Sequence, residues 1–163
     1  MTPVGNLFVI AAPSGGGKTS LTRALLEREP GIKLSVSYTT RPARPGERDG
    51  VDYHFITADR FMALLATGEF LEHAPVHGNW YATSATWLKG EVAAGRDVLL
   101  EIDWQGASQV RELVPDSVHV FILPPSLESL EQRLVKRGQD DAATIARRHK
   151  AAREEIRHCE EFD

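Results

Sequence analysis

Hydrophobic residues along the 163-residue chain fall into short apolar runs separated by amphipathic stretches. The runs predict buried strands at residues 7–12, 33–39, 97–103 and 117–123. The intervening periodicity predicts helices at residues 18–29, 58–68, 84–95, 104–113, 126–138 and 140–161. In the first helix, Leu21, Leu25 and Leu26 are expected on one apolar face. Alternating strands and helices predict an α/β protein, a parallel sheet flanked by helices.

The stretch from about residue 38 to residue 95 interrupts this alternation. Its first part is rich in proline, glycine and arginine, which is loop chemistry around a short strand at residues 53–56. Residues 69–83 predict a bent pair of short strands. We therefore expect a single domain at residues 1–163, with a core at 1–37 and 96–163 and a small lobe inserted at about 38–95.

Composition excludes several classes of protein. The chain is 42% hydrophobic and 26% charged, which suits one globular domain. A net charge of −4 argues against a nucleic-acid or anionic-membrane surface. Cys159 is the single cysteine, so no intrachain disulfide can form. With no signal-peptide pattern and no apolar run of about 18 residues, a cytoplasmic location is expected.

A glycine-rich loop joins the first predicted strand to the first predicted helix. The sequence APSGGGKT nearly meets G-x-x-x-x-G-K-[ST], with Ala12 in place of the first glycine. Backbone N–H groups and the helix dipole at such a junction bind phosphate. Lys18 would reach the β and γ phosphates of a nucleoside triphosphate, and the Thr19 hydroxyl would bind Mg²⁺. The predicted ATP-binding residues here are Ala12, Pro13, Ser14, Gly15, Gly16, Gly17, Lys18, Thr19 and Ser20.

Two carboxylates follow the third predicted core strand. Glu101 and Asp103 project on the same side because strand side chains alternate. Glu101 is therefore predicted to hold the Mg²⁺ through a water molecule. Solvated loop acids are the alternative for either residue alone, but the nearby phosphate loop favours the functional interpretation.

The segment SVSYTTRPARPGERDGVDYHF carries the second substrate signal. Arg41 and Arg44 lie on proline-stiffened backbone and could grip a phosphate. The segment resembles the guanylate kinase pattern S-x-x-T-T-R-x-x-R-x-G-E-x-x-G-x-D-Y-x-F. The matching residues are Ser37, Thr39, Thr40, Arg41, Arg44, Gly46, Glu47, Gly50, Asp52, Tyr53 and Phe55. GEFLEHAPVHGNWYAT and LLEIDWQG resemble later motifs of that family, so the resemblance covers nearly the whole chain.

The resemblance implies a P-loop nucleoside monophosphate kinase fold with a GMP-binding lobe and a helical lid at about residues 137–148. The implied activity is transfer of the ATP γ-phosphate to GMP or dGMP, with Mg²⁺. The residues implied to bind the GMP phosphate are Arg41, Arg44, Tyr53 and Tyr81, and those implied to bind guanine are Ser37, Glu72, Thr83 and Asp103. Arg133, Arg137 and Arg148 are implied to face ATP. The implied catalytic set is Lys18, Arg41, Arg137 and Arg148.

Guanine chemistry supports the placement of Glu72 independently. The guanine edge offers N1–H and an exocyclic amine, so an acceptor-only carboxylate complements it. Adenine presents a bare N1 acceptor there and would face the carboxylate lone pairs. A site built for such hydrogen bonds can reject the wrong base by roughly 10⁴-fold.

The sequence departs from the family pattern at several positions. Glu101 replaces the commoner aspartate, Ala82 a usual glycine, and His149 a usual apolar residue. The family pattern also continues past Asp163 with a further strand and a helix. A kinase acting on a sugar phosphate and a non-catalytic guanylate-kinase-like module are the alternatives. We expect ATP and GMP as partners, without nucleic acid or membrane, and leave monomer or homodimer open.

Overall fold

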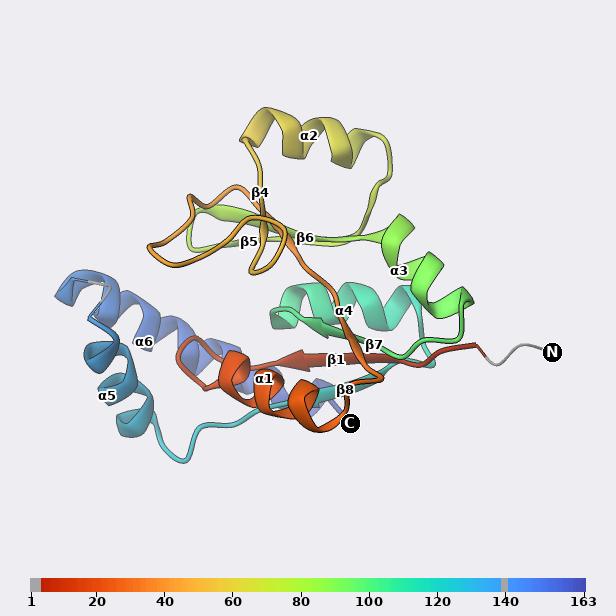
Figure 1. Ribbon diagram of the computed structural model, residues 1–163. Helices are drawn as coiled ribbons and strands as arrows, with labels where there is room; N and C mark the ends of the chain where they lie inside the picture. Colours follow the sequence, from red (N-terminus) through yellow and green to blue (C-terminus); the bar gives the residue numbers. More distant parts are fainter. Residues whose placement is uncertain (1–3, 139–140) are drawn as a thin grey trace.

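Two separate sheets organise the computed structural model, which describes residues 4–138 and 141–163 (Figure 1). The core sheet contains β1 (Leu7–Ala11), β2 (Lys33–Leu34), β7 (Val98–Glu101) and β8 (Val118–Phe121). Its order is β2-β7-β1-β8, and every neighbouring pair is parallel. The predicted parallel sheet is therefore present, with β1 at its interior.

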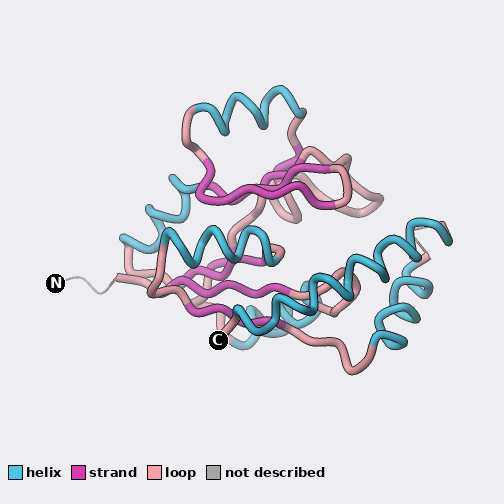
Figure 2. Tube along the Cα trace, turned by 180° about the vertical axis from the view of Figure 1, so that it is seen from behind, coloured by secondary structure: helices cyan, strands magenta, loops and turns pink. Residues whose placement is uncertain are grey.

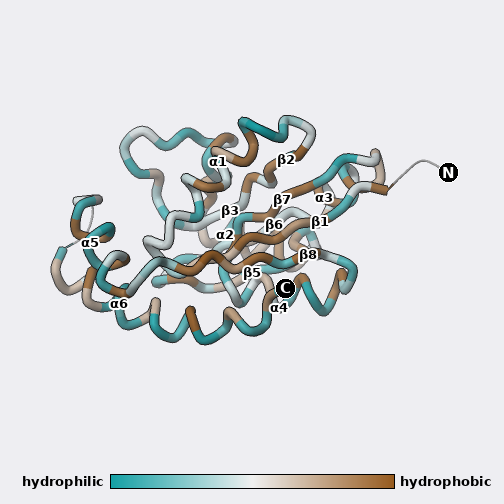
Figure 3. The backbone as a smooth tube through the Cα atoms, turned by 90° about the horizontal axis from the view of Figure 1, so that it is seen from below, coloured by the Kyte–Doolittle hydropathy of each residue, from teal (hydrophilic) through white to brown (hydrophobic). Residues whose placement is uncertain are grey.

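Helices cover both faces of the core sheet. Helix α1 (Lys18–Arg28) lies on one face, and Figure 2 shows α4 (Trp104–Leu113) and α6 (Ala142–Arg157) on the other. Val9 and Leu100 are completely buried and pack in one cluster with Ala107 and Val110 of α4. Figure 3 shows this arrangement as hydrophobic core strands among more hydrophilic helices. Burying each large aliphatic side chain contributes about 1.5–3 kcal/mol, so this layer fixes where the strand ends lie.

The small sheet lies above the core and contains β3 (Tyr38–Thr39), β4 (His54–Phe55), β5 (Phe70–Val76) and β6 (Asn79–Ser84). Its order is β4-β3-β6-β5, which leaves β5 as an outer strand. His77 and Gly78 both have positive φ, as a two-residue hairpin turn between β5 and β6 requires. The predicted bent strand pair is confirmed.

Two further helices complete the segment that contains the small sheet. Helix α2 (Ala58–Ala66) buries Phe61 against the rings of Phe70 and Trp80. Helix α3 (Ala85–Ala93) follows β6 directly and places Leu88 in the core cluster. The whole segment is inserted between β2 and β7, as predicted, whereas its boundaries as a functional lobe stay a prediction.

The predicted strand at residues 33–39 is wrong, because this segment contributes to both sheets. Ser35 makes a hydrogen bond to Leu99 on β7, but Ser37 already accepts one from His54 on the small sheet. The chain therefore leaves one ladder and joins another within three residues. An alternating polar and apolar pattern does not distinguish one continuous strand from two short ones in different sheets.

The predicted apolar face of the first helix is also partly wrong. Leu21 is 51% exposed, whereas Thr22 is 1% exposed and is the buried residue of α1. Adjacent residues differ by about 100° around a helix, so a small rotation exchanges which of them faces the core.

The C-terminal helices form an arm at one end of the core sheet (Figure 1). Helix α5 (Leu127–Arg137) packs on α6 through Leu130, Leu134 and Ala152, and η1 (His158–Glu161) follows α6. The predicted helix at 140–161 thus appears as α6 and η1, while residue 140 lies outside the described residues. Within residues 4–138 and 141–163, no helix is both long and apolar enough to cross a membrane.

Candidate active site

The glycine-rich loop is shaped to expose backbone N–H groups at the N-terminus of α1. Gly15 and Gly17 adopt φ values of 82° and 93°, which side-chain-bearing residues rarely adopt, and Gly17 caps the helix. A Cβ on Gly16 would lie 2.9 Å from the Pro13 carbonyl oxygen. Because the first N–H groups of a helix have no internal partners, this loop can surround an anion.

Lys18 is held at the boundary between the loop and the end of β7. Its Nζ donates a hydrogen bond to the Ile102 carbonyl oxygen at 3.0 Å. Burial lowers the pKa of Lys18, while the charges of Glu101 and Asp103 oppose this shift. The ammonium group is thus held by the Ile102 carbonyl, a contact that it could exchange for an incoming phosphate.

Thr19 and Glu101 form a pair of oxygen ligands beside the lysine. The Thr19 hydroxyl donates to Glu101 Oε1 at 2.6 Å. No group of three or more His, Cys, Asp or Glu side chains suitable for a metal occurs in the part of the chain that the structure describes. Two hard oxygen donors suit Mg²⁺, which usually retains waters and takes its other ligands from substrate phosphates.

Glu155 of α6 reaches the phosphate loop, a contact that the sequence interpretation missed. Its Oε2 accepts a hydrogen bond from the Ser14 N–H at 3.0 Å. Burial raises the pKa of Glu155, and the Ser14 hydrogen bond opposes the shift. Glu155 follows Arg148 by seven residues, two helical turns, so the spacing from a predicted site residue could have revealed it.

The three predicted ATP-facing arginines are placed differently. Arg133 Nη1 donates to the Gly16 carbonyl oxygen at 3.3 Å, so this residue touches the phosphate loop. Arg148 is partly buried on α6, close enough to Glu155 for its charge to lower the pKa of that carboxyl. Arg137 ends α5, but its side chain lies outside the described residues.

Arg41 is pre-positioned by a carboxylate of the same loop. Its Nη1 and Nη2 donate to the two Glu47 oxygens at 2.9 and 2.8 Å, and the Arg44 N–H donates to Glu47 as well. Although burial opposes it, hydrogen bonding to Glu47 and Tyr81 raises the pKa of Arg41. The fixed guanidinium stands 5.3 Å from the Tyr53 ring centroid, a cation–π arrangement.

The predicted tyrosines lie in contact, Tyr53 just before β4 and Tyr81 on β6. The rings of Tyr53 and Tyr81 meet edge to face with centroids 5.9 Å apart. Burial raises the pKa of Tyr53 to about 12, and the charges of Tyr81 and Glu101 contribute. The two rings thus stand beside the Arg41 guanidinium, which lies over the Tyr53 ring.

Glu72 is a buried carboxylate on β5, only 3% exposed. Thr83, opposite it on β6, donates a hydrogen bond to Oε1 at 2.7 Å. Burial raises the pKa of Glu72 to about 7, although the Thr83 hydrogen bond opposes the shift. A Cβ on Gly106 would lie 2.3 Å from Glu72 Oε2, so only glycine permits this approach to α4.

Asp103 and Ser37 complete the predicted base-binding set. Asp103 caps α4 by accepting a hydrogen bond from the Gly106 N–H at 3.0 Å. It therefore lies on the same helical turn that Glu72 contacts. Ser37 immediately precedes β3, where its carbonyl accepts the His54 N–H at 2.9 Å. The structure thus brings Glu72, Thr83 and Asp103 together, and places Ser37 at the start of the small sheet.

Comparison with known proteins accounts for this arrangement. The family model for guanylate kinase matches residues 4–163, which includes the phosphate loop, both sheets and the C-terminal helices. The chain belongs to the guanylate kinase family. The family resemblance predicted from the sequence motifs is therefore confirmed.

Individual guanylate kinases are similar along almost the whole chain. One from Aromatoleum aromaticum is 63% identical over 159 residues, 98% of this chain and 78% of that protein. Another from Methylobacillus flagellatus is 62% identical, covering 98% and 79%. The crystal structure of a guanylate kinase from Anaplasma phagocytophilum superposes with a TM-score of 0.81 at 40% identity, covering 98% of this chain and 74% of that one. The predicted α/β fold is confirmed.

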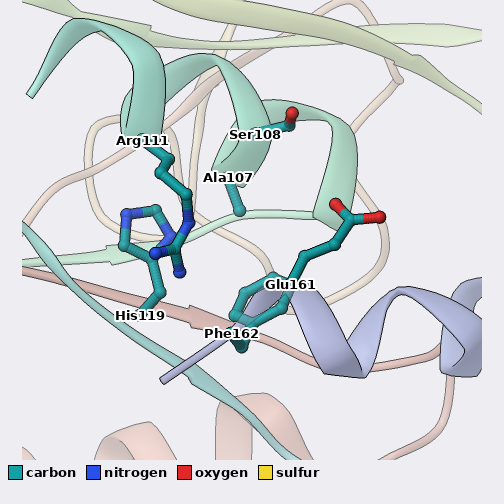
Figure 4. A pocket seen from close by; sticks show the side chains of 6 residues that line it. All are labelled: Ala107, Ser108, Arg111, His119, Glu161 and Phe162. Carbon is teal, nitrogen blue, oxygen red and sulfur yellow. The ribbon is translucent and has the colours of Figure 1, made fainter. Parts of the chain in front are cut away.

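A small cavity of about 20 Å³ elsewhere in the molecule lies between α4, β8 and η1 (Figure 4). His119 and Arg111 point toward it, and Asp163 accepts the His119 N–H at 2.9 Å. A space of this size holds about one water molecule. It is lined by Ala107, Ser108, Arg111, His119, Glu161 and Phe162, none of which belongs to the predicted nucleotide sites.

Proposed function

We propose that this protein transfers the γ-phosphate of ATP to GMP, and to dGMP, giving ADP and GDP or dGDP. The observation that carries the proposal is the pairing of a phosphate loop around Lys18 with the buried carboxylate of Glu72 and its neighbour Asp103. The first suits a nucleoside triphosphate. The second complements the N1–H and amine of guanine. Membership of the guanylate kinase family supports the same conclusion.

In this proposal ATP lies along the phosphate loop and α1. Lys18 leaves the Ile102 carbonyl to bind the β and γ phosphates, and Arg133, Arg137 and Arg148 face the triphosphate from the C-terminal arm. The proposed ATP-binding residues are Ala12, Pro13, Ser14, Gly15, Gly16, Gly17, Lys18, Thr19, Ser20, Arg133 and Arg137. Residues 137–148 act as the lid, of which residues 139–140 lie outside the described structure.

Mg²⁺ is the proposed cofactor, supplied with ATP. The Thr19 hydroxyl would bind it directly, and Glu101 would hold one of its waters, which the 2.6 Å contact between these side chains suits. When bound, the ion neutralises phosphate charge. Glu101 is one methylene longer than the aspartate usual in the family, which would change how the water shell of the ion is held.

GMP lies against the small sheet in this proposal. Arg41, Arg44, Tyr53 and Tyr81 bind its phosphate, and Ser37, Glu72, Thr83 and Asp103 bind guanine. Residues 38–95 then act as the GMP-binding lobe, and residues 1–37 and 96–163 form the core into which this lobe is inserted. The Arg41 guanidinium has two N–H donors on Glu47 and one on the Pro42 carbonyl, so some of its five N–H groups remain for a phosphate oxygen.

The reaction needs no general base. A phosphate oxygen of GMP, already anionic, attacks the γ phosphorus, and the bond to the β–γ bridging oxygen breaks, so ADP leaves with that electron pair. The residues orient the two nucleotides in line and neutralise the transferring group. Closure of the lid over the arginines excludes water and suppresses ATP hydrolysis.

The alternatives fit the site less well. A sugar-phosphate acceptor would bring no N–H donor edge to the buried carboxylate of Glu72, which would keep Thr83 alone as its hydrogen-bond donor although it is only 3% exposed. A non-catalytic module would not need Lys18 and Thr19 in working positions. We further propose a cytoplasmic enzyme whose partners are ATP and GMP, without nucleic acid or membrane.

A panel assay of acceptors tests the proposal. ADP formation is followed with ATP, Mg²⁺ and either GMP, dGMP, AMP, a pyrimidine monophosphate or a sugar phosphate. We expect rapid turnover with the two guanine nucleotides alone. A preference for a sugar phosphate, or no turnover with any acceptor, would refute the proposed activity and identify which alternative holds.

A further inference from the structure

Two glutamine side chains of the core helix α4 close the free edge of β5. The Gln109 carboxamide binds both backbone groups of His73: Oε1 accepts the His73 N–H at 3.1 Å, and Nε2 donates to the His73 carbonyl at 2.8 Å. Gln105 Nε2 donates to the Pro75 carbonyl at 3.1 Å. Because β5 is an outer strand, these backbone groups would otherwise lie on an open sheet edge.

The spacing of the two elements explains why the contacts match. His73 and Pro75 are two residues apart, so their backbone groups point to the same edge, about 6.7 Å apart along the strand. Gln105 and Gln109 are four residues apart, about one turn or 6 Å along the helix. Pro75 has no N–H and receives one donor, whereas His73 receives a donor and an acceptor. The carboxamides thus replace the next strand of the sheet.

The contacts of Gln105 and Gln109 with the backbone of β5, called the clamp below, also fix Glu72, the residue before His73. Glu72 is held from one side by Thr83 and lies against Gly106, which sits between the two glutamines on α4. Gln105 Nε2 also donates to Asp103 Oδ2 at 2.9 Å. Helix α4 therefore positions both carboxylates that the proposed function assigns to guanine. Asp103 belongs to the core, and Glu72 belongs to the small sheet.

We propose that Gln109, supported by Gln105, is a positioning residue that sets the location of Glu72 and through it the selectivity for guanine. The inference rests on the proposed function. Gln109 acts on β5 through the backbone groups of His73. Its loss allows β5 to shift relative to Asp103, so that the two carboxylates no longer match the guanine edge together.

The test compares Gln109→Ala with Glu112→Ala, an exposed residue of the same helix, in the complete chain. For Gln109→Ala we expect KM for GMP to rise about tenfold, as for loss of one to two good hydrogen bonds. The ATP KM and kcat should stay within about twofold, and the preference for GMP over AMP should fall. Glu112→Ala should leave all of these unchanged. A Gln109→Ala enzyme with unaltered GMP KM and selectivity overturns the inference.

Two measurements separate this from failure to fold or from failure of the proposed function. Gln109→Glu keeps size and helix propensity but sets a carboxylate oxygen against the His73 carbonyl, so it should also raise the GMP KM. Amide hydrogen exchange in a peptide covering 70–76 should accelerate in both variants, without nucleotide present. Unchanged exchange contradicts the clamp. Wild-type protein that does not phosphorylate GMP refutes the proposed function instead, while exchange still reports on the clamp.

Discussion

The Thr19 hydroxyl and the Glu101 carboxylate meet at 2.6 Å, joining the first turn of α1 to the end of β7. Thr19 and Glu101 are 82 residues apart in sequence. Their contact therefore depends on the parallel pairing of β1 with β7. A hydroxyl and a carboxylate together beside a phosphate loop form a suitable place for Mg²⁺ bound to ATP.

The Glu101→Gln variant should need more Mg²⁺. Glutamine keeps an acceptor oxygen but carries no negative charge, so it holds the metal-bound water more weakly, and we expect the Mg²⁺ concentration for half-maximal activity to rise about 10- to 100-fold. Glu101→Asp, which retains the charge, should fall between this variant and wild type. Activity is measured against Mg²⁺ at fixed ATP, after EDTA treatment abolishes turnover. If the activity of Glu101→Gln and of wild type depended on Mg²⁺ concentration in the same way, Glu101 would have no role at the metal site.

Lys18→Ala and Arg41→Ala should separate the two phosphate sites. Lys18 is proposed to bind the ATP phosphates and not GMP, so its loss should lower kcat by about 10²- to 10³-fold and leave GMP binding largely intact. Arg41→Ala removes a charged grip on the GMP phosphate and should weaken GMP binding by about 10- to 100-fold. Calorimetric titration of GMP into both variants is the measurement. Equal losses of GMP affinity would contradict the assignment.

Guanine binding should depend on pH through Glu72. Its pKa of about 7 in the free protein means that lowering the pH through 7 protonates the carboxyl. A protonated carboxyl turns one of its two oxygens into a donor and can no longer accept from both the N1–H and the amine of guanine, so kcat/KM for GMP should fall about tenfold per pH unit below 7.

The Glu72→Gln variant is the control for this pH dependence. Its kcat/KM for GMP should be low throughout and lack the step near pH 7, while ionisation of the GMP phosphate affects both enzymes alike. A profile of the same shape in wild type and Glu72→Gln would assign the step to another group.

Glu155→Ala should impair the ATP side of the site alone. Without its carboxylate, the Ser14 N–H loses its partner, and the phosphate loop is no longer fixed to α6. We expect the ATP KM to rise about tenfold with GMP affinity unchanged. Glu155→Gln retains an acceptor oxygen and should be milder. Glu154→Ala, whose side chain is exposed and pairs with Arg157, should behave as wild type.

Local sequence patterns predicted much of this molecule and missed what depends on tertiary contact. The loop around Lys18 was predictable because glycine positions and helix starts are local properties. The division of residues 33–39 between two sheets was not, since the same alternation suits either sheet. The choice of Thr22 rather than Leu21 as the buried residue likewise depends on how α1 is rotated on the sheet.

The residues of the candidate site also fall into two groups, those that sequence motifs predict and those that depend on tertiary contact. Motif positions such as Arg41 and Glu72 are fixed by resemblance to a family pattern. The contacts of Glu155 and Gln109 depend on helices meeting segments 141 and 36 residues away in sequence. Glutamines four residues apart on a helix are common, and only the neighbouring strand edge gives this pair a function.

The central claim is tested most directly by following the label of γ-³²P-ATP in a mixture of GMP and AMP at equal concentrations. We predict that the label appears in GDP, with kcat/KM for GMP exceeding that for AMP by about 10⁴-fold. Little label should appear as inorganic phosphate, because the closed site excludes water. Comparable labelling of the two diphosphates, or label released mainly as phosphate, would contradict a guanine-selecting phosphotransferase.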